Sequence, residues 1–264
     1  MSDSDVLWEP PTDYTALIRH LFRSDETRTL VRAMKNMMGA SYGRRHEMEY
    51  VDPLVDAVLY CNDKEKLDIS VRYKGWNVLH VAAYHGCGHL IYRLCGEERE
   101  LIDLQLAASV CYPQRASVLM MIAHGQTAAL SSQESAFEQA GFKMVYRLGD
   151  EALRHRDAQG CTVLHFAAVH GVVKMVAALI ERNVELDARG AMREWRFDGC
   201  GLDIMATSVF EEGKGWTDVP YDMTPRTPLE CAEMRYKMTS KYLPSNAVSM
   251  VNLRETIKLL KQVR

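Results

Sequence analysis

The sequence contains no segment that would carry the chain into or across a membrane. No apolar run approaches the ~18 consecutive residues that a membrane-spanning helix needs. The first residues, MSDSDVLWEPP, are acidic and lack both the apolar core of a signal peptide and the basic amphipathic character of an organellar presequence. The formal net charge of −3 is too small to attract nucleic acid or an anionic membrane surface. We therefore expect no membrane partner and no nucleic-acid partner.

The cysteines lack the pattern of a disulfide framework. There are seven of them, an odd number, and they are scattered without a C-x-x-C pair. A secreted domain would be expected to pair its cysteines, whereas thiols stay reduced in the cytoplasm and nucleus. The pattern predicts a cytoplasmic protein, with the nucleus as the alternative.

The motifs of common enzyme classes are also missing. The sequence has no G-x-S-x-G, no phosphate-binding G-x-x-x-x-G-K-[ST], no H-E-x-x-H and no G-x-G-x-x-G. Gly199-Cys200-Gly201 comes nearest to a nucleotide-binding loop, but it lacks the third glycine and a following helix. Cys200 with a distant histidine would be a conceivable nucleophile, yet nothing in the sequence activates it. We expect no catalysis, no cofactor, no metal and no small-molecule substrate.

One pattern occurs twice in the chain. Residues 75–86 read GWNVLHVAAYHG, and residues 160–171 read GCTVLHFAAVHG. Weaker copies follow the same frame, SVLMMIAHG at 117–125 and TPLECA at 227–232. Recurrence of this kind is typical of a protein built from stacked structural units.

These segments resemble the ankyrin repeat, whose signature runs D-x-x-G-x-T-P-L-H-x-A-A-x-x-G. The best unit is 157–189, and 75–107 is the second clear one. The resemblance implies an all-α solenoid of stacked helix-turn-helix units that binds other proteins through its concave face. The residues of the best unit that match the signature are Asp157, Gly160, Thr162, Leu164, His165, Ala167, Ala168 and Gly171.

The physical chemistry of the repeated segment supports the same fold. Thr162 and Asn77 each precede an apolar run, as a helix N-cap should. The alanine pair gives the first helix a thin side, and Gly171 and Gly86 end it by allowing left-handed backbone angles. The following segment, VVKMVAALI, has one apolar stripe at helical spacing. Such a helix pair cannot bury its stripe alone, so neighbouring units must complete the core.

The histidines of the pattern raise the alternative of a metal or catalytic cluster. The two in each copy are five residues apart, which places them on poorly matched helix faces, unlike the i, i+4 spacing of helical zinc sites. In the ankyrin family the histidine of T-P-L-H is structural and hydrogen-bonds groups within and between units. The resemblance therefore implies a structural role for His80 and His165.

The spacing of the units predicts insertions. The motif leucines Leu79, Leu119, Leu164 and Leu229 lie 40, 45 and 65 residues apart, against a period of roughly 33. We expect extra residues at 97–114, after a second helix, and at 126–140, where they would separate the paired helices of one unit. The third insertion is about 191–222, and its glycines favour a long loop or hairpin over a degenerate extra repeat, which stays as the alternative.

The organisation that follows is an N-terminal extension at 1–27 and a repeat domain of four to five units at 28–264. The extension contains a short amphipathic helix, DYTALIRHLF, that would cap the stack. TLVRAMKNMM and DPLVDAVLYC read as a degenerate first unit. In the last unit Glu230 replaces the motif histidine, which a terminal unit tolerates because it has one neighbour.

The function this organisation implies is a non-catalytic adaptor that binds one or more proteins. The alternative is a structural subunit of a large multiprotein or ribonucleoprotein assembly, which would suit the 15 methionines. The oligomeric state stays open. The expected contact residues lie at turn tips, on exposed sides of first helices and in the insertion, where large aromatic residues often dominate interface energetics. They are Tyr73, Lys74, Trp76, Tyr84, His85, Gln159, His170, Trp195, Phe197, Trp216, Arg226 and Tyr236. For Trp76 the alternative is packing on a neighbouring turn tip, and for the aromatic residues of the insertion it is folding back onto the stack.

Overall fold

The structure is a computed structural model, and it describes residues 76–84, 91, 110–111, 115–125, 131–192, 195–197, 200–202, 208–211, 215–218, 224–241 and 243–263. The chain divides into two compact units, Met1–Tyr73 and Lys74–Arg264, and every described residue belongs to the second. The expected N-terminal extension with its capping helix and the degenerate first unit lie outside the described residues. So does nearly all of the expected insertion at 97–114.

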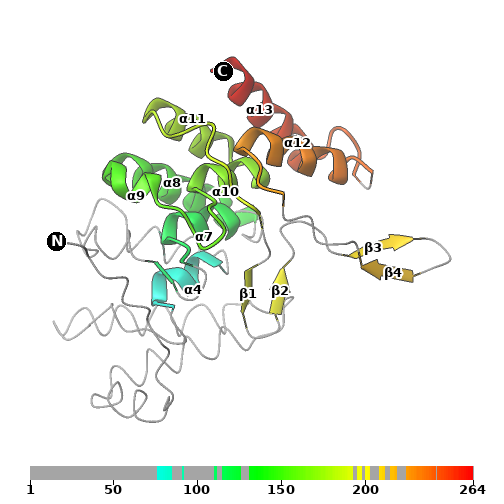
Figure 1. The fold of residues 1–264 in the computed structure, drawn as a ribbon, viewed down its shortest axis with the longest axis horizontal. Helices are drawn as coiled ribbons and strands as arrows, with labels where there is room; N and C mark the ends of the chain where they lie inside the picture. Colours follow the sequence, from blue (N-terminus) through cyan, green and yellow to red (C-terminus); the bar gives the residue numbers. More distant parts are fainter. Residues whose placement is uncertain are drawn as a thin grey trace, which may run out of the picture. The chain divides into compact units, whose positions relative to one another are not determined.

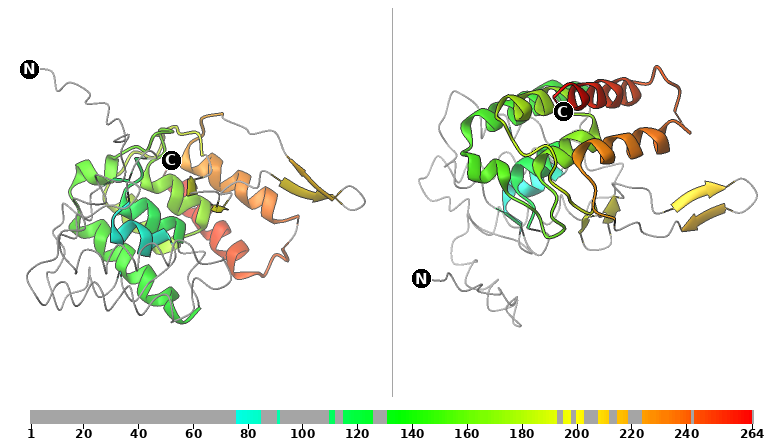
Figure 2. Two further views of the ribbon diagram at one scale, coloured as in Figure 1. Left: turned by 90° about the horizontal axis from the view of Figure 1, so that it is seen from below. Right: turned by 45° about the horizontal axis from the view of Figure 1, so that its top comes forward.

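The compact unit Lys74–Arg264 is a stack of helix pairs (Figure 1). Four first helices pack consecutively against one another: α4 on α7, α7 on α10, and α10 on α12. The second helices form a parallel row, with α8 on α11 and α11 on α13 (Figure 2). The first helices are α4 (Val78–Tyr84), α7 (Val118–Gly125), α10 (Val163–His170) and α12 (Pro228–Thr239), and the second helices are α8 (Ser131–Arg147), α11 (Val173–Glu181) and α13 (Val248–Gln262). A short helix, α9 (Asp150–Arg154), precedes the turn that leads into α10.

The apolar positions of the repeated pattern make the core of this stack. The motif leucines of all four first helices are buried, and so are the paired alanines of α4 and α10. Small side chains let neighbouring helices approach closely, which is why the alanines recur at the contact between rows. Gly171 ends α10 with φ +66°, and the N–H of Val172 donates to the Ala167 carbonyl at 2.9 Å. The expected glycine stop and the expected stacking are both confirmed here.

The insertion at 126–140 was expected to separate the paired helices of the repeat unit that begins with α7, and this expectation is wrong. Residues from Ser131 onward belong to α8, which is 17 residues long, against 9 for α11. The segment SSQESAFEQA contains no glycine or proline, and its Gln, Glu and Ala residues are good helix formers. The extra residues therefore lengthen the second helix.

The segment between α11 and α12 contains two β hairpins. In the first, β1 (Trp195–Phe197) pairs with β2 (Cys200–Leu202) in antiparallel register, with Trp195 opposite Leu202. In the second, β3 (Ser208–Glu211) pairs with β4 (Gly215–Asp218), and Phe210 lies opposite Trp216. The expected insertion thus contains hairpins, while α10 and α12, the first helices of the units before and after it, still pack directly on each other.

Candidate protein-binding surface

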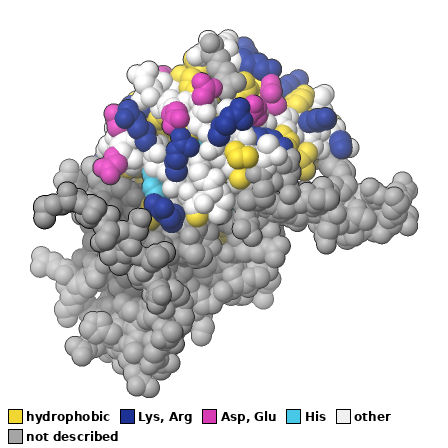
Figure 3. Space-filling model, viewed as in Figure 1, with side chains coloured by type: hydrophobic (Ala, Val, Ile, Leu, Met, Phe, Trp, Pro, Cys, Tyr) yellow, Lys and Arg dark blue, Asp and Glu magenta, His cyan; other side chains and the backbone are white. Residues whose placement is uncertain are grey.

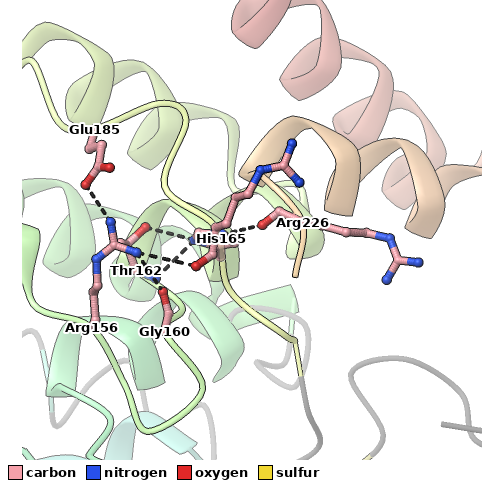
Figure 4. A network of polar contacts seen from close by, with 7 residues as sticks. Arg156, Gly160, Thr162, His165, Glu185 and Arg226 are labelled. Atoms are coloured by element: carbon pink, nitrogen blue, oxygen red, sulfur yellow. Dashed lines mark hydrogen bonds and ion pairs between the residues drawn. The ribbon is translucent and has the colours of Figure 1, made fainter. Parts of the chain in front are cut away.

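The histidine of the best unit joins two neighbouring units (Figure 4). The N–H and the hydroxyl of Thr162 both lie 3.0 Å from His165 Nδ1, which must accept from the N–H. The ring proton is therefore on Nε2, and it donates to the carbonyl of Arg226 at 3.0 Å. Burial lowers the pKa of His165 to about 4, outweighing the Arg226 carbonyl bond that raises it. The ring is neutral at pH 7 and acts as the structural bridge that the resemblance implied.

His80 has the matching local role in α4. Its backbone N–H donates to Asn77 Oδ1 at 3.0 Å, and its Nδ1 donates to the same oxygen at 2.6 Å. Both histidines therefore hold the N-cap of their own helix. Among the residues that the structure describes, no group of three His, Cys, Asp or Glu side chains could hold a metal ion.

The insertion begins and ends at one turn tip, where its two ends are tied together. Gly190 and Arg226 form an antiparallel bridge, each N–H donating to the other's carbonyl at 3.0 Å. The N–H of Ala191 donates to the carbonyl of Gln159, in the turn tip of the preceding unit, at 3.0 Å. A Cβ atom at Gly190 would lie 2.6 Å from the backbone nitrogen of Cys161, so this approach requires glycine. The units before and after the insertion therefore stay in direct backbone contact at its base.

Arg156 braces the same pair of turn tips from the other side (Figure 4). Its Nη1 donates to the carbonyls of Gly160 and Arg189, each at 3.4 Å, and its Nη2 pairs with Glu185 at 2.7 Å. Asp157 Oδ1 accepts the N–H groups of Gln159 and Cys161, which shapes the turn itself. The tips of consecutive units are therefore cross-linked by side chains as well as by the backbone bridge.

Three of the expected contact residues meet inside the stack in a row of rings that crosses three units. We call Trp76, Tyr84, His124 and His170 the ring row. Trp76 meets Tyr84 edge-on with centroids 5.2 Å apart, and Tyr84 stacks on His124, also at 5.2 Å. His124 Nδ1 lies 3.2 Å from His170 Nε2, within hydrogen-bond distance.

The expectation that Trp76 and Tyr84 are exposed is wrong, because they are 1% and 2% exposed. Aromatic rings of this size bury most surface when they pack on one another between units, which outweighs their value at a turn tip. Burial lowers the pKa of His124 to about 4, and burial, His124 and Arg235 together lower the pKa of His170 well below its ordinary value.

The remaining expected contact residues fall into four groups. Gln159 and Arg226 come together at the turn tips beneath the insertion, and both are half-buried. Tyr236 is half-buried on α12, away from the tip bridge. Trp195 and Phe197 are in β1 and Trp216 is in β4, where the structure describes the backbone alone. Tyr73, Lys74 and His85 lie outside the described residues.

The sequence reasoning missed one feature and did not decide between loop and hairpin for another. His124 completes the ring row, and a signal for it exists, since His-Gly occurs at 85–86, 124–125 and 170–171 at the same place in three copies. The first hairpin was also readable, because Asp198-Gly199 separates two short runs in the spacing that favours a two-residue hairpin turn.

The comparisons with known proteins address the family. The ankyrin repeat family model matches residues 159–191, the unit that contains α10, α11 and the Gly190 bridge. This chain is an ankyrin-repeat protein. Within the described residues, the first helices of three further units stack with the matched ankyrin unit: α7 and α12 pack on α10, and α4 packs on α7. No curated protein matches the chain. Among the described helices of this ankyrin-repeat protein, none is long and apolar enough to span a membrane.

Proposed function

We propose that this ankyrin-repeat chain is a non-catalytic adaptor that binds a partner protein chiefly through its insertion at 191–222. Ankyrin repeats are protein-binding modules, typically without catalytic activity. The observation that supports the insertion as the contact element is its base. Gly190 and Arg226 pair across it, so the helix stack continues as if the insertion were absent. A segment that the fold does not need for its own packing is available for recognition.

The composition of the insertion indicates the kind of partner. Residues 191–222 include seven acidic and three basic residues, a formal charge of −4 where the whole chain has −3. The same segment contains five aromatic residues, Trp195, Phe197, Phe210, Trp216 and Tyr221. Aromatic residues supply binding energy, and a concentrated charge of one sign selects the opposite sign. The partner surface that fits is basic and apolar.

The face of the stack seen in Figure 3 supports this choice. Within the described part of that face, basic and acidic side chains alternate with small apolar areas, and no large patch of one kind is visible. Gln159 and Arg226, at the base of the insertion, are the described residues that we propose extend the contact onto the stack. Trp76 and Tyr84 are assigned to the interior, where Trp76 packs on Tyr84 and Tyr84 stacks on His124 of the next unit.

The test replaces residues 193–223 by Asn-Gly. This two-residue turn keeps Met192 opposite Thr224 in the register that the Gly190–Arg226 bridge sets. Partners captured by the intact chain are identified by mass spectrometry, and the affinity of each purified partner is then measured for both chains. We expect the shortened chain to keep its helical circular dichroism spectrum and to lose at least tenfold in affinity. Equal affinities would show that the partner binds elsewhere.

A matched pair of charge variants tests the chemistry of the partner. Glu211→Gln removes one negative charge from the insertion, and Glu255→Gln removes one from the exposed side of α13. We expect the first variant to weaken binding and to flatten its dependence on salt, since fewer opposite charges meet at the interface. The second variant should leave both unchanged.

Exposed apolar residues on the last unit favour a second candidate, a permanent subunit of a large assembly. Val248 is 70% exposed, and Val251 and Leu243 are 42% and 41% exposed. A terminal unit usually presents a polar outer side, so these residues suit a fixed neighbour. Size-exclusion chromatography of native extract separates the candidates, because an adaptor with transient partners should also elute as a free species of 30.0 kDa.

A further inference from the structure

Two Thr-Pro dipeptides lie three residues apart just after the insertion, and they differ in their exposure to solvent. Thr227-Pro228 starts α12, where Thr227 is the N-cap and is 3% exposed. The Thr227 hydroxyl accepts the N–H of Glu230 at 3.3 Å, and Glu230 Oε2 accepts the N–H of Thr227 at 2.8 Å. Thr224-Pro225, by contrast, is exposed. No other Ser or Thr in the sequence precedes a proline.

Positive groups surround the exposed dipeptide. Arg226 Nη1 donates to the carbonyl of Thr224 at 3.4 Å, and Arg189 Nη1 donates to the carbonyl of Pro225 at 3.1 Å. The N-terminus of the 12-residue helix α12 follows at Pro228, and helix N-termini favour negative charge. Among the described residues, the opposing charge at this place is Glu230, whose carboxylate lies 3.6 Å from Arg189. Within the described part of the chain, two guanidinium groups and the start of α12 are therefore opposed by one carboxylate. This balance of charge favours the binding of an anion.

We propose that Thr224 is a phosphorylation site for a proline-directed protein kinase, and that Arg189 and Arg226 bind the phosphate at the start of α12. A residue before proline is held extended, the backbone shape such kinases take at the acceptor position. The Thr224 hydroxyl oxygen attacks the γ-phosphoryl group of ATP, and the new O–P bond forms as the bond to the β-phosphate breaks. ADP leaves with that electron pair, and a base of the kinase takes the hydroxyl proton.

The phosphate would act on the base of the insertion. Arg226 is half of the backbone bridge with Gly190, and Arg189 directly precedes that glycine, so a phosphate held by both side chains clamps the two ends together. It also adds about −1.5 to −2 of charge beside an acidic segment. Resting on the proposed function, we infer that phosphorylation strengthens selection of a basic partner.

The first experiment establishes the site and needs no partner. The intact full chain and the Thr224→Ala variant are incubated with a cyclin-dependent kinase and ATP, and phosphorylated residues are located by tandem mass spectrometry. We expect one phosphate on Thr224, none on Thr227, and none on the variant. Phosphate on Thr227, or none on the intact chain, would overturn the assignment. Because Thr227 has the same neighbouring proline, it controls for the dipeptide and isolates the effect of exposure.

The second experiment tests the arginines by ³¹P NMR. Phosphothreonine is introduced at position 224 of the full chain, and its second pKa is compared with that of a phosphorylated peptide of residues 222–225, which contains neither arginine. Two guanidinium groups nearby should lower that pKa by about one unit relative to the peptide. Arg189→Gln and Arg226→Gln should each return part of the shift, and both retain the backbone bridge. A pKa equal to that of the peptide would overturn the binding role, and partner affinity enters neither measurement.

Discussion

At the start of each described first helix, the N-cap residue interacts with the residue three positions further along. The pair of residues differs in each of the four helices. Asn77 is held by His80, Ser117 by Met120, Thr162 by His165 and Thr227 by Glu230. Every pair satisfies N–H groups that the first helical turn leaves without a partner. His165 adds a bond to the carbonyl of Arg226 in the next unit, so it couples local structure to stacking.

Removing that ring should cost substantial stability. His165→Ala deprives the buried Thr162 N–H of its acceptor and removes one of the two donors to the Arg226 carbonyl, which keeps the N–H of Gly190. We expect the free energy of unfolding to fall by about 1–3 kcal/mol, the cost of one unsatisfied buried group. Urea denaturation measures this free energy of unfolding. His155→Ala is the control, because the Nε2 of His155 contacts the Arg115 carbonyl at an exposed place, and it should cost under about 1 kcal/mol. Equal losses would contradict the bridging role.

A substitution at Gly190 tests whether the two turn tips at the base of the insertion must approach each other this closely. In Gly190→Ala the new methyl group would lie 2.6–2.7 Å from the backbone and the sulfur of Cys161, so the backbone of one turn tip must move. We expect a loss of at least about 2 kcal/mol, in the range of overpacked cores. Gly149→Ala is the matched control. Its Cβ would meet nothing within 4 Å, and its φ of −67° suits alanine, so that variant should be neutral or slightly stabilising in thermal denaturation.

At the scale of elements, Arg182 fastens the end of α8 to the end of α11. Its Nη1 donates to the carbonyl of Val145 at 2.7 Å, and its Nη2 reaches the carbonyl of Leu148 at 3.2 Å and the carboxylate of Asp150 at 2.8 Å. The last carbonyls of a helix have no partner within it, so a side chain that reaches them stabilises that end. The side chain is 23% exposed, which reduces the electrostatic part of this contribution.

We therefore expect Arg182→Ala to lower stability by about 1–2 kcal/mol, the range for hydrogen bonds from a charged donor after partial solvent screening. Amide exchange should accelerate at Leu148, whose N–H donates within the last turn of α8. Arg154→Ala provides the comparison, because Arg154 pairs with the same Asp150 at 3.8 Å with both side chains exposed. That variant should change stability by under about 0.5 kcal/mol. Unchanged exchange at Leu148 in Arg182→Ala would argue against the fastening role.

The sequence predicted elements well where one unit contains the whole signal. N-caps, the alanine pair and the glycine stop of α10 are local, so the helices α10 and α11 could be placed from their own residues. The length of α8 was misjudged because ankyrin spacing was given more weight than the helix-forming residues of SSQESAFEQA. Glycine density indicates turns without giving a strand register, so the sequence predicts only a loop or hairpin where the structure has two hairpins.

At the scale of the molecule, the sequence could not place side chains whose neighbours come from other units. Trp76 and Tyr84 occupy positions where the ankyrin pattern predicts exposed residues, but Tyr84 stacks on His124, one unit along. The contact between His124 and His170 likewise joins residues 46 positions apart. Burial at such positions depends on what the next unit presents, and no single-unit pattern contains that information.

These buried histidines predict a stability that declines in mild acid. The pKa values of His124 and His165 are about 4 and that of His170 is also lowered, whereas an unfolded chain has histidine pKa values near 6.5. The unfolded state therefore binds more protons below pH 6.5, so stability is complete above that pH and is lost as the pH falls towards 4. Each histidine contributes a slope of at most about 1.4 kcal/mol per pH unit.

Urea midpoints measured between pH 7.5 and 5, where most carboxylates stay charged, should be flat above pH 6.5 and fall below it. His124→Phe separates this effect from general acid sensitivity. Phenylalanine can still stack on Tyr84 but cannot take up a proton, so the variant should be less stable at pH 7.5, having lost the bond to His170, and should show a shallower slope below pH 6.5. Parallel slopes in the two proteins would mean that His124 is not kept neutral by the stack, and a midpoint that rises below pH 6.5 would contradict the burial of all three rings.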